Sequence, residues 1–191
     1  MNRRLLPVRP VRAARLAIVA TAIVAVFAWS CGDPVHNARV DALGPETGGG
    51  PGPTHRPGQP CLTCHSDQGP ANAQLSVAGT IYQSAAPGSP PLAGATVTIF
   101  DATQDADGGA PHTFLTNAAG NFYAPKSDWT PFFPLHDISV TSPDLATPTM
   151  MHTVVGRDGS CATCHFDPKG PDSHGHIYLV LDPADLPGAM P

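Results

Sequence analysis

Two short segments of the sequence carry the same pattern of reactive side chains. Residues 61–65 read CLTCH and residues 161–165 read CATCH, so four of the five cysteines lie in two copies of one motif. Two thiols at this spacing can form thioether bonds to the two vinyl groups of a haem, and the histidine that follows can ligate its iron. The sequence therefore predicts two covalent c-type haems, one attached to Cys61 and Cys64 with His65 on the iron, the other attached to Cys161 and Cys164 with His165 on the iron.

Cysteine pairs of this spacing have other uses. Two such pairs could form a tetrahedral zinc site with four thiolate ligands, a pair could be a redox dithiol, or each pair could form a disulfide in an oxidising compartment. None of these alternatives needs a histidine directly after both pairs. The repeated histidine therefore favours haem over zinc and over disulfides.

Each iron has a second axial position, and several side chains near the motifs could fill it. His55 precedes Cys61 by six residues, and the run TMMH ends nine residues before Cys161. The sequence HGH follows His165 after a gap rich in glycine and proline. Each candidate could instead be a solvated side chain or core filler. Histidine ligation would give a lower potential than methionine ligation. The candidate distal ligands are His55, Met150, Met151, His152, His174 and His176.

The first 30 residues are expected to be a signal peptide. The stretch MNRRLLPVRPVRAAR holds five arginines and no acid, and a run of 12 apolar residues follows it. A basic region followed by an apolar region of this length is typical of bacterial export signals. The residues Ala28 to Cys31 resemble the lipobox of bacterial lipoproteins. The resemblance implies that Cys31 carries a lipid, whereas ordinary cleavage nearby would leave it a spare thiol.

Charge and export together limit the partners. The whole chain carries 10 basic and 15 acidic side chains, and removal of the signal would take five of the basic ones away. An acidic chain is a poor partner for nucleic acid, which needs a basic patch. We expect an exported lipoprotein, periplasmic or on the outer surface, anchored to a bacterial membrane and meeting other redox proteins through transient contacts.

The rest of the chain predicts a mainly β domain. Residues 31–54 are rich in glycine and proline and predict a flexible tether, which leaves residues 55–191 as the haem-bearing domain. Alternating strand-like runs occur at 76–82, 94–100, 137–141 and 177–181, and 23 prolines limit helices. This spacing predicts an antiparallel, Greek-key-type β-sandwich. Each motif histidine lies 12 residues before a terminal strand, so both motifs are expected at one end of the sandwich.

One part of the chain resembles a known scaffold. The stretches AGTIYQ, PLAGATVTIFDA and TFLTNAAGNFYAP are similar to the carboxypeptidase-regulatory-like, or transthyretin-like, β-sandwich over residues 76–142. The matching positions are Gly79, Gly94 to Thr98, and a hairpin with Thr116, Gly120 and Phe122 that is one residue longer than the family pattern. The resemblance implies a structural scaffold and no activity.

Taken together, the chain resembles small multihaem c-type cytochromes built on a β-sandwich and exported as lipoproteins. This resemblance implies electron transfer rather than enzyme activity. A di-haem peroxidase or small-molecule reductase is the first alternative, and it needs an iron with an open site. A haem-carrying sensor or binding module is the second.

Overall fold

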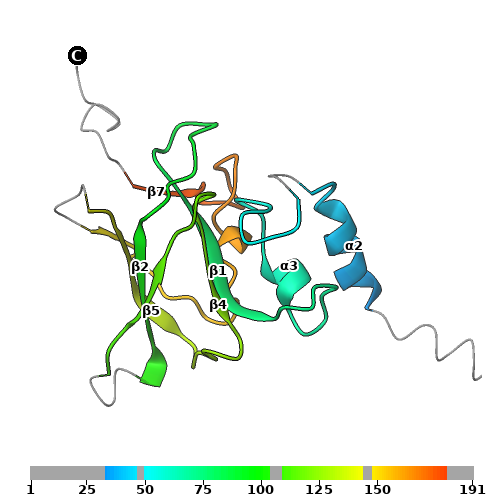
Figure 1. Ribbon diagram of the computed structural model, residues 1–191, viewed down its shortest axis with the longest axis horizontal. Coiled ribbons are helices and arrows are strands. Elements are labelled where there is room, and N and C mark those ends of the chain that lie inside the picture. The colour runs from blue at the N-terminus through cyan, green and yellow to red at the C-terminus, as the bar shows by residue number, and fades with distance from the viewer. Residues whose placement is uncertain (1–32, 47–49, 104–108, 144–147, 180–191) are drawn as a thin grey trace, which may run out of the picture.

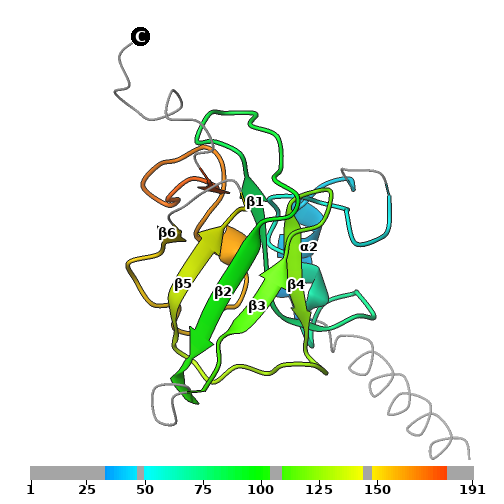
Figure 2. The same cartoon turned by 60° about the vertical axis from the view of Figure 1, so that its left-hand side comes forward.

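The computed structural model describes residues 33–46, 50–103, 109–143 and 148–179. This part of the chain is mainly β, with two sheets and a few short helices (Figures 1 and 2). The predicted β-rich class is confirmed. The elements are α2 (Pro34–Ala42), α3 (Leu62–His65), β1 (Leu75–Tyr82), β2 (Thr96–Asp101), β3 (His112–Leu115), β4 (Asn121–Pro125), β5 (Leu135–Thr141), β6 (Thr149–Met150), the 3₁₀ turn η1 (Cys161–Thr163) and β7 (Ile177–Tyr178).

The strands form one sheet of three and one of four. The first has the order β4-β1-β7 and the second the order β3-β2-β5-β6. The pairs are antiparallel except β1 with β7, which is parallel and aligns Ile81 with Ile177. The first and last strands thus run the same way, as the sequence predicted. The two strands are offset along their length, however, because the first residue of β7, Ile177, pairs with Ile81 near the end of β1.

The segment that resembles a family hairpin is a crossover between the two sheets. Strand β3 pairs with β2 through Leu115 opposite Thr96, whereas β4 pairs with β1 through Asn121 opposite Thr80. The turn between them closes tightly, with the Gly120 amide donating to the Asn117 carbonyl. The expectation of a hairpin is therefore wrong for strand pairing, because each strand finds its partner in a different sheet.

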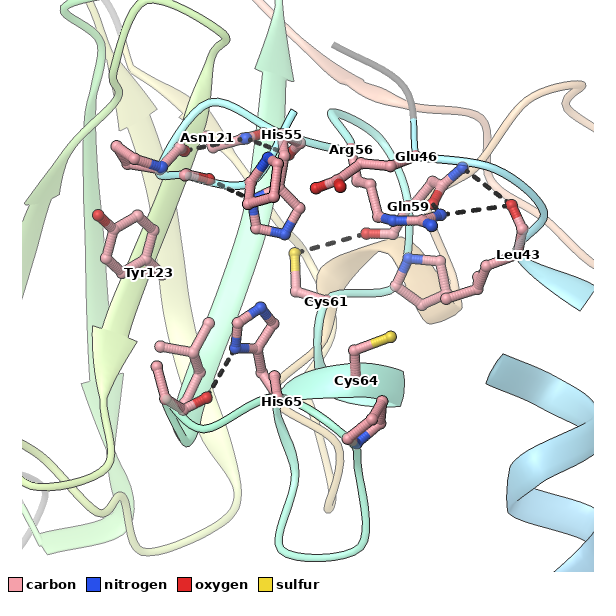
Figure 3. Close-up of a pocket in the computed structure, with 18 of the residues that line it drawn as sticks. Leu43, Glu46, His55, Arg56, Gln59, Cys61, Cys64, His65, Asn121 and Tyr123 are labelled. Atoms are coloured by element: carbon pink, nitrogen blue, oxygen red, sulfur yellow. Dashed lines mark hydrogen bonds between the residues drawn. The ribbon is translucent and has the colours of Figure 1, made fainter. Parts of the chain in front are cut away.

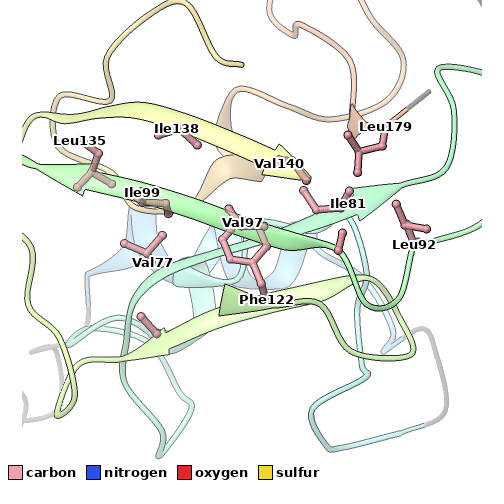
Figure 4. Close-up of a cluster of buried hydrophobic side chains, with 12 residues drawn as sticks. Val77, Ile81, Leu92, Val97, Ile99, Phe122, Leu135, Ile138, Val140 and Leu179 are labelled. Carbon is pink, nitrogen blue, oxygen red and sulfur yellow. The ribbon is translucent and has the colours of Figure 1, made fainter. Parts of the chain in front are cut away.

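A core of small aliphatic side chains draws on both sheets (Figure 4). Val97 and Ile99 of β2 are each 1 % exposed, which confirms the alternation read from that strand. Ile81 and Val77 of β1 face them, and Leu179 joins from the end of the described chain. Burial of each such side chain contributes about 1.5–3 kcal/mol.

The region predicted as a tether is partly ordered. Asp33 caps α2 by accepting a hydrogen bond from the Val35 amide at 2.9 Å, and Pro34 occupies the first turn, where its missing N–H costs nothing. The search for helical periodicity did not predict this helix, because it buries no side chain and so has no apolar stripe. The predicted signal peptide, Cys31 and residues 180–181 of the last predicted strand lie outside the described residues. No helix in the described ranges is long and apolar enough to cross a membrane.

Candidate functional site

Each motif folds into a single helical turn, which is α-helical in α3 and 3₁₀ in η1. In each, the histidine amide donates to the carbonyl of the first cysteine, at 2.9 Å for His65 to Cys61 and 2.9 Å for His165 to Cys161. Residues three and four apart share one face of a helical turn. The turn therefore presents both thiols and the imidazole to the same side, which is the arrangement needed to hold a haem by its edge and its iron.

Both turns are positioned by strand β1. The Ala78 amide donates to the Gly159 carbonyl at 2.9 Å, which docks the segment before the second motif. The Gly58 amide donates to Thr80 Oγ1 at 2.8 Å, which docks the segment before the first. The motifs therefore lie along the same central strand, and both α3 and η1 contact it (Figure 1).

The first motif opens into a cavity of about 590 Å³ (Figure 3). Cys61, Cys64 and His65 line one side of it, and His55 lies across from His65. The remaining wall comes from β4, from residues before and after the motif, and from part of the predicted tether, namely Leu43, Glu46, Pro51, Gly52 and Pro53. Asn117 holds the end of this segment by donating from Nδ2 to the Pro53 carbonyl at 2.5 Å, and Asn121 of β4 donates to the His55 carbonyl at 3.0 Å. The end of the predicted tether is therefore part of the folded unit, contrary to the sequence-based boundary.

The second motif opens into a larger cavity of about 960 Å³. Cys161, Cys164 and His165 line it together with core side chains of β1, β2 and β5. Residues 149–160 form the opposite wall. Both volumes fall in the range of about 300–1,000 Å³ that is usual for ligand and cofactor sites.

Each motif histidine has a second histidine beside it. The ring centroids of His55 and His65 are 5.7 Å apart, and those of His165 and His174 are 5.6 Å apart. Metal–nitrogen bonds of about 2 Å, with ring centroids about 1.2 Å behind the nitrogens, would place two imidazoles on opposite sides of one metal about 6.4 Å apart. The two observed separations are slightly shorter than this value, so each pair would need to open by less than about 1 Å to occupy the two axial positions of one iron.

Hydrogen bonds orient three of these four rings. His65 Nδ1 lies 2.7 Å from the Ala73 carbonyl and His165 Nδ1 lies 3.1 Å from the Gly175 carbonyl, while His55 Nδ1 contacts the Gly52 carbonyl. A carbonyl can only accept, so each Nδ1 is the donor and each Nε2 keeps a free lone pair. This is the usual way in which a protein selects the tautomer of a ligating histidine.

The other candidate distal ligands make different contacts in the structure. His176 uses both ring nitrogens, on Asp167 Oδ2 at 2.7 Å and on the Ser84 carbonyl at 2.7 Å, so neither is free for a metal. Sequence spacing alone could not separate His176 from its neighbour His174. The other three candidates, Met150, Met151 and His152, lie in the wall of the second cavity. Met151 also packs against the hydrophobic core.

Burial favours the uncharged thiol at the first cysteine of each motif. It raises the pKa of Cys61 to about 11 and that of Cys161 to about 12, and the nearby Cys61 adds to the shift at Cys161. Burial also lowers the pKa of His165, which favours the neutral imidazole that can ligate iron. The four motif cysteines are free thiols in this structure.

The described residues contain no group of three or more His, Cys, Asp or Glu side chains that could hold a metal ion by themselves. An iron already held by a porphyrin needs only one or two protein ligands. Each cavity is lined by a pair of neighbouring histidines that would hold the iron and by both cysteines of its motif, which would hold the porphyrin. The donor set of both cavities therefore fits haem.

Several lining residues were not identified from the sequence. Arg56, Glu46 and Tyr123 line the first cavity, and Phe122 lines both cavities. No motif pointed to them, since they reach the site only through the fold of the N-terminal segment and the pairing of β4 with β1.

Searches against protein-family models, curated proteins and solved structures gave no match to this chain.

Proposed function

We propose that this protein transfers electrons by means of two covalently attached c-type haems. One haem is bound by Cys61 and Cys64, the other by Cys161 and Cys164. The observation that carries the proposal is that the same histidine pairing, at 5.7 Å and 5.6 Å, occurs in two separate cavities beside a complete CxxCH motif.

The axial ligands follow from that pairing. His65 and His55 would ligate one iron, and His165 and His174 the other. A haem iron ligated in this way exchanges single electrons between its ferrous and ferric states. Histidines on both sides leave no position for a substrate, which supports a carrier of electrons and not an enzyme.

The protein scaffold would hold these ligands still. Nδ1 hydrogen bonds fix the rings of His55, His65 and His165, and the helical turns fix the cysteines. The two sheets would serve as a Greek-key-type sandwich that carries both motifs on β1. A rigid ligand set lowers the structural change that accompanies each electron gained or lost.

The same proposal includes the cellular setting. Attachment of c-type haem takes place outside the bacterial cytoplasm, which agrees with the signal-like residues 1–30. A lipid on Cys31 would anchor the mature protein to a membrane, where other redox proteins meet it through small, transient interfaces.

The first test is the cofactor content of the protein from a bacterial host that matures c-type cytochromes. We expect an intact mass that exceeds the polypeptide by two haems, and near-infrared spectra typical of bis-histidine ligation. A colourless protein, or one whose mass shows no added haem, would overturn the proposal.

The second test separates electron transfer from the peroxidase and reductase alternatives. These enzymes need an iron that can bind a small molecule. We expect the reduced protein not to bind carbon monoxide, because both axial positions are taken. Rapid carbon monoxide binding by one haem would favour an enzyme with an open site.

A further inference from the structure

Few cationic side chains follow the predicted signal peptide, and two of them line the cavities. Arg56 is the one lysine or arginine among the described residues of the first cavity, and Arg157 is the one in the second. Elsewhere, Lys126 pairs with Asp67 at 2.5 Å. Arg39 is exposed on α2 and lines neither cavity.

Arg56 is held in place without a carboxylate partner in the described residues. Its guanidinium donates to Gln59 Oε1 at 2.7 Å and to the Gly44 carbonyl at 2.9 Å. Both acceptors are neutral, so they do not compensate the positive charge. The backbone at Arg56 has φ of 49°, a conformation that is uncommon for a side chain of this size and that often marks functional positions. Arg56 directly follows His55, and both residues line the first cavity. The unusual backbone at Arg56 therefore lies beside a candidate iron ligand.

The second cavity has its own pair of polar groups. The neighbouring carboxylate, Asp158, accepts from the Ser160 amide at 2.8 Å and from Thr163 Oγ1 at 2.7 Å, so it stabilises the motif turn and does not pair with Arg157. Ser160 itself is 3 % exposed, and its hydroxyl has no hydrogen-bond partner in the described protein. A buried hydroxyl without a partner costs about 1–3 kcal/mol, so a ligand that accepts from it would be favoured.

We propose that Arg56 in the first cavity, and Arg157 in the second, bind the propionate carboxylates of the haems. This inference rests on the proposed function. Each haem carries two carboxylates, and arginine matches a carboxylate with two parallel hydrogen bonds. The two arginines would thus set the rotation of each haem in its cavity and supply a positive charge near each iron.

The test compares three matched variants: Arg56→Gln, Arg157→Gln and the control Arg39→Gln. Each removes one positive charge and keeps a side chain that can donate hydrogen bonds. Intact mass counts the haems, and a redox titration followed by optical spectra gives both midpoint potentials. A nearby cation disfavours the ferric form, so we expect each cavity variant to lower one midpoint and leave the other unchanged. The control should change neither.

A further variant, Arg56→Lys, keeps the positive charge but removes the planar guanidinium group, which can donate two parallel hydrogen bonds to a carboxylate. We expect a smaller fall in midpoint potential than in Arg56→Gln.

The outcomes separate this inference from the proposed function. Variants that keep two haems but titrate like Arg39→Gln would overturn the carboxylate assignment and leave the haem proposal standing. A wild-type protein without haem would overturn the proposed function itself. If Arg56→Gln failed to fold, Arg157→Gln would decide the question for the second cavity, and two haems with the midpoints of Arg39→Gln would count against the assignment.

Discussion

The two cavities have the same reactive side chains but different surroundings. The first lies between β4 and residues 43–56 of the N-terminal segment, away from most of the core. The second is lined by core side chains that include Ile81, Val97 and Ile99, each 1 % exposed or less. A ligand of the first cavity would therefore be held under an outer segment, whereas a ligand of the second would be part of the core.

This difference shows that a motif specifies chemistry without specifying its environment. Both turns have the same hydrogen bond from histidine to the first cysteine, and both dock on β1. What differs is which chain segments close over the turn. The consequences for stability and for redox behaviour should therefore differ between two sites whose local sequences are almost the same.

The largest expected difference concerns removal of each haem. We expect Cys61→Ala with Cys64→Ala, and Cys161→Ala with Cys164→Ala, to lose one haem each. The second pair should lose more stability, by about 3–5 kcal/mol, because it leaves an empty space inside the core. Chemical denaturation of the two single-haem proteins measures this difference. Equal losses of stability would contradict the contrast between an outer and an inner site.

Removal of the distal histidines should affect one site at a time. His55→Ala and His174→Ala are each expected to convert one of the two haems from low-spin to high-spin, with carbon monoxide binding at that haem alone. His152→Ala is the matched control, since His152 is exposed in the wall of the second cavity and is not paired with His165. Electronic and resonance Raman spectra report the spin state. A high-spin haem in the His152 variant would show that His152, and not His174, is the distal ligand in the second cavity.

Gly79 should matter to the second site more than to the first. A Cβ there would lie 2.8 Å from the Phe122 ring and 2.9 Å from Cys161 Cβ. We expect Gly79→Ala to cost about 1–3 kcal/mol and to reduce attachment of the second haem, because packed side chains must move. Gly156→Ala is the control, as a Cβ at that position has no neighbour within 4 Å. Thermal unfolding and haem content together give the answer, and a fully loaded, fully stable Gly79 variant would contradict it.

His176 should contribute to stability but not to the spectrum. Its two hydrogen bonds join Asp167 to the Ser84 carbonyl, which ties the loop after the second motif to the end of β1. We expect His176→Ala to cost about 1–3 kcal/mol, the usual result of leaving a buried polar group unpaired. The haem spectra should remain those of the wild type, in contrast to His174→Ala. A change in ligation in the His176 variant would show that its role has been assigned wrongly.

Much of the β scaffold could be predicted from local patterns. The alternation in β2, and in β5 from Ile138 on, reflects one buried face, and that pattern is visible along the chain. Strand β1 is instead buried on both faces from Val77 to Ile81, which its sequence pattern does not show. Helix α2 was missed because it has no buried face, and the crossover from β3 to β4 was taken for a hairpin because a tight turn does not reveal which strands pair.

The sequence by itself determined which reactive side chains each motif places together, because residues three and four apart in a helical turn face the same way whatever surrounds them. It did not determine which candidate stands beside each motif histidine. His55 and His174 were two of six possibilities, and only the path of residues 43–56 and the loop after Cys164 brings their rings to 5.7 Å and 5.6 Å from those of His65 and His165. Contacts between distant segments depend on long-range pairing around β1, and that pairing is set by the packing of the whole core.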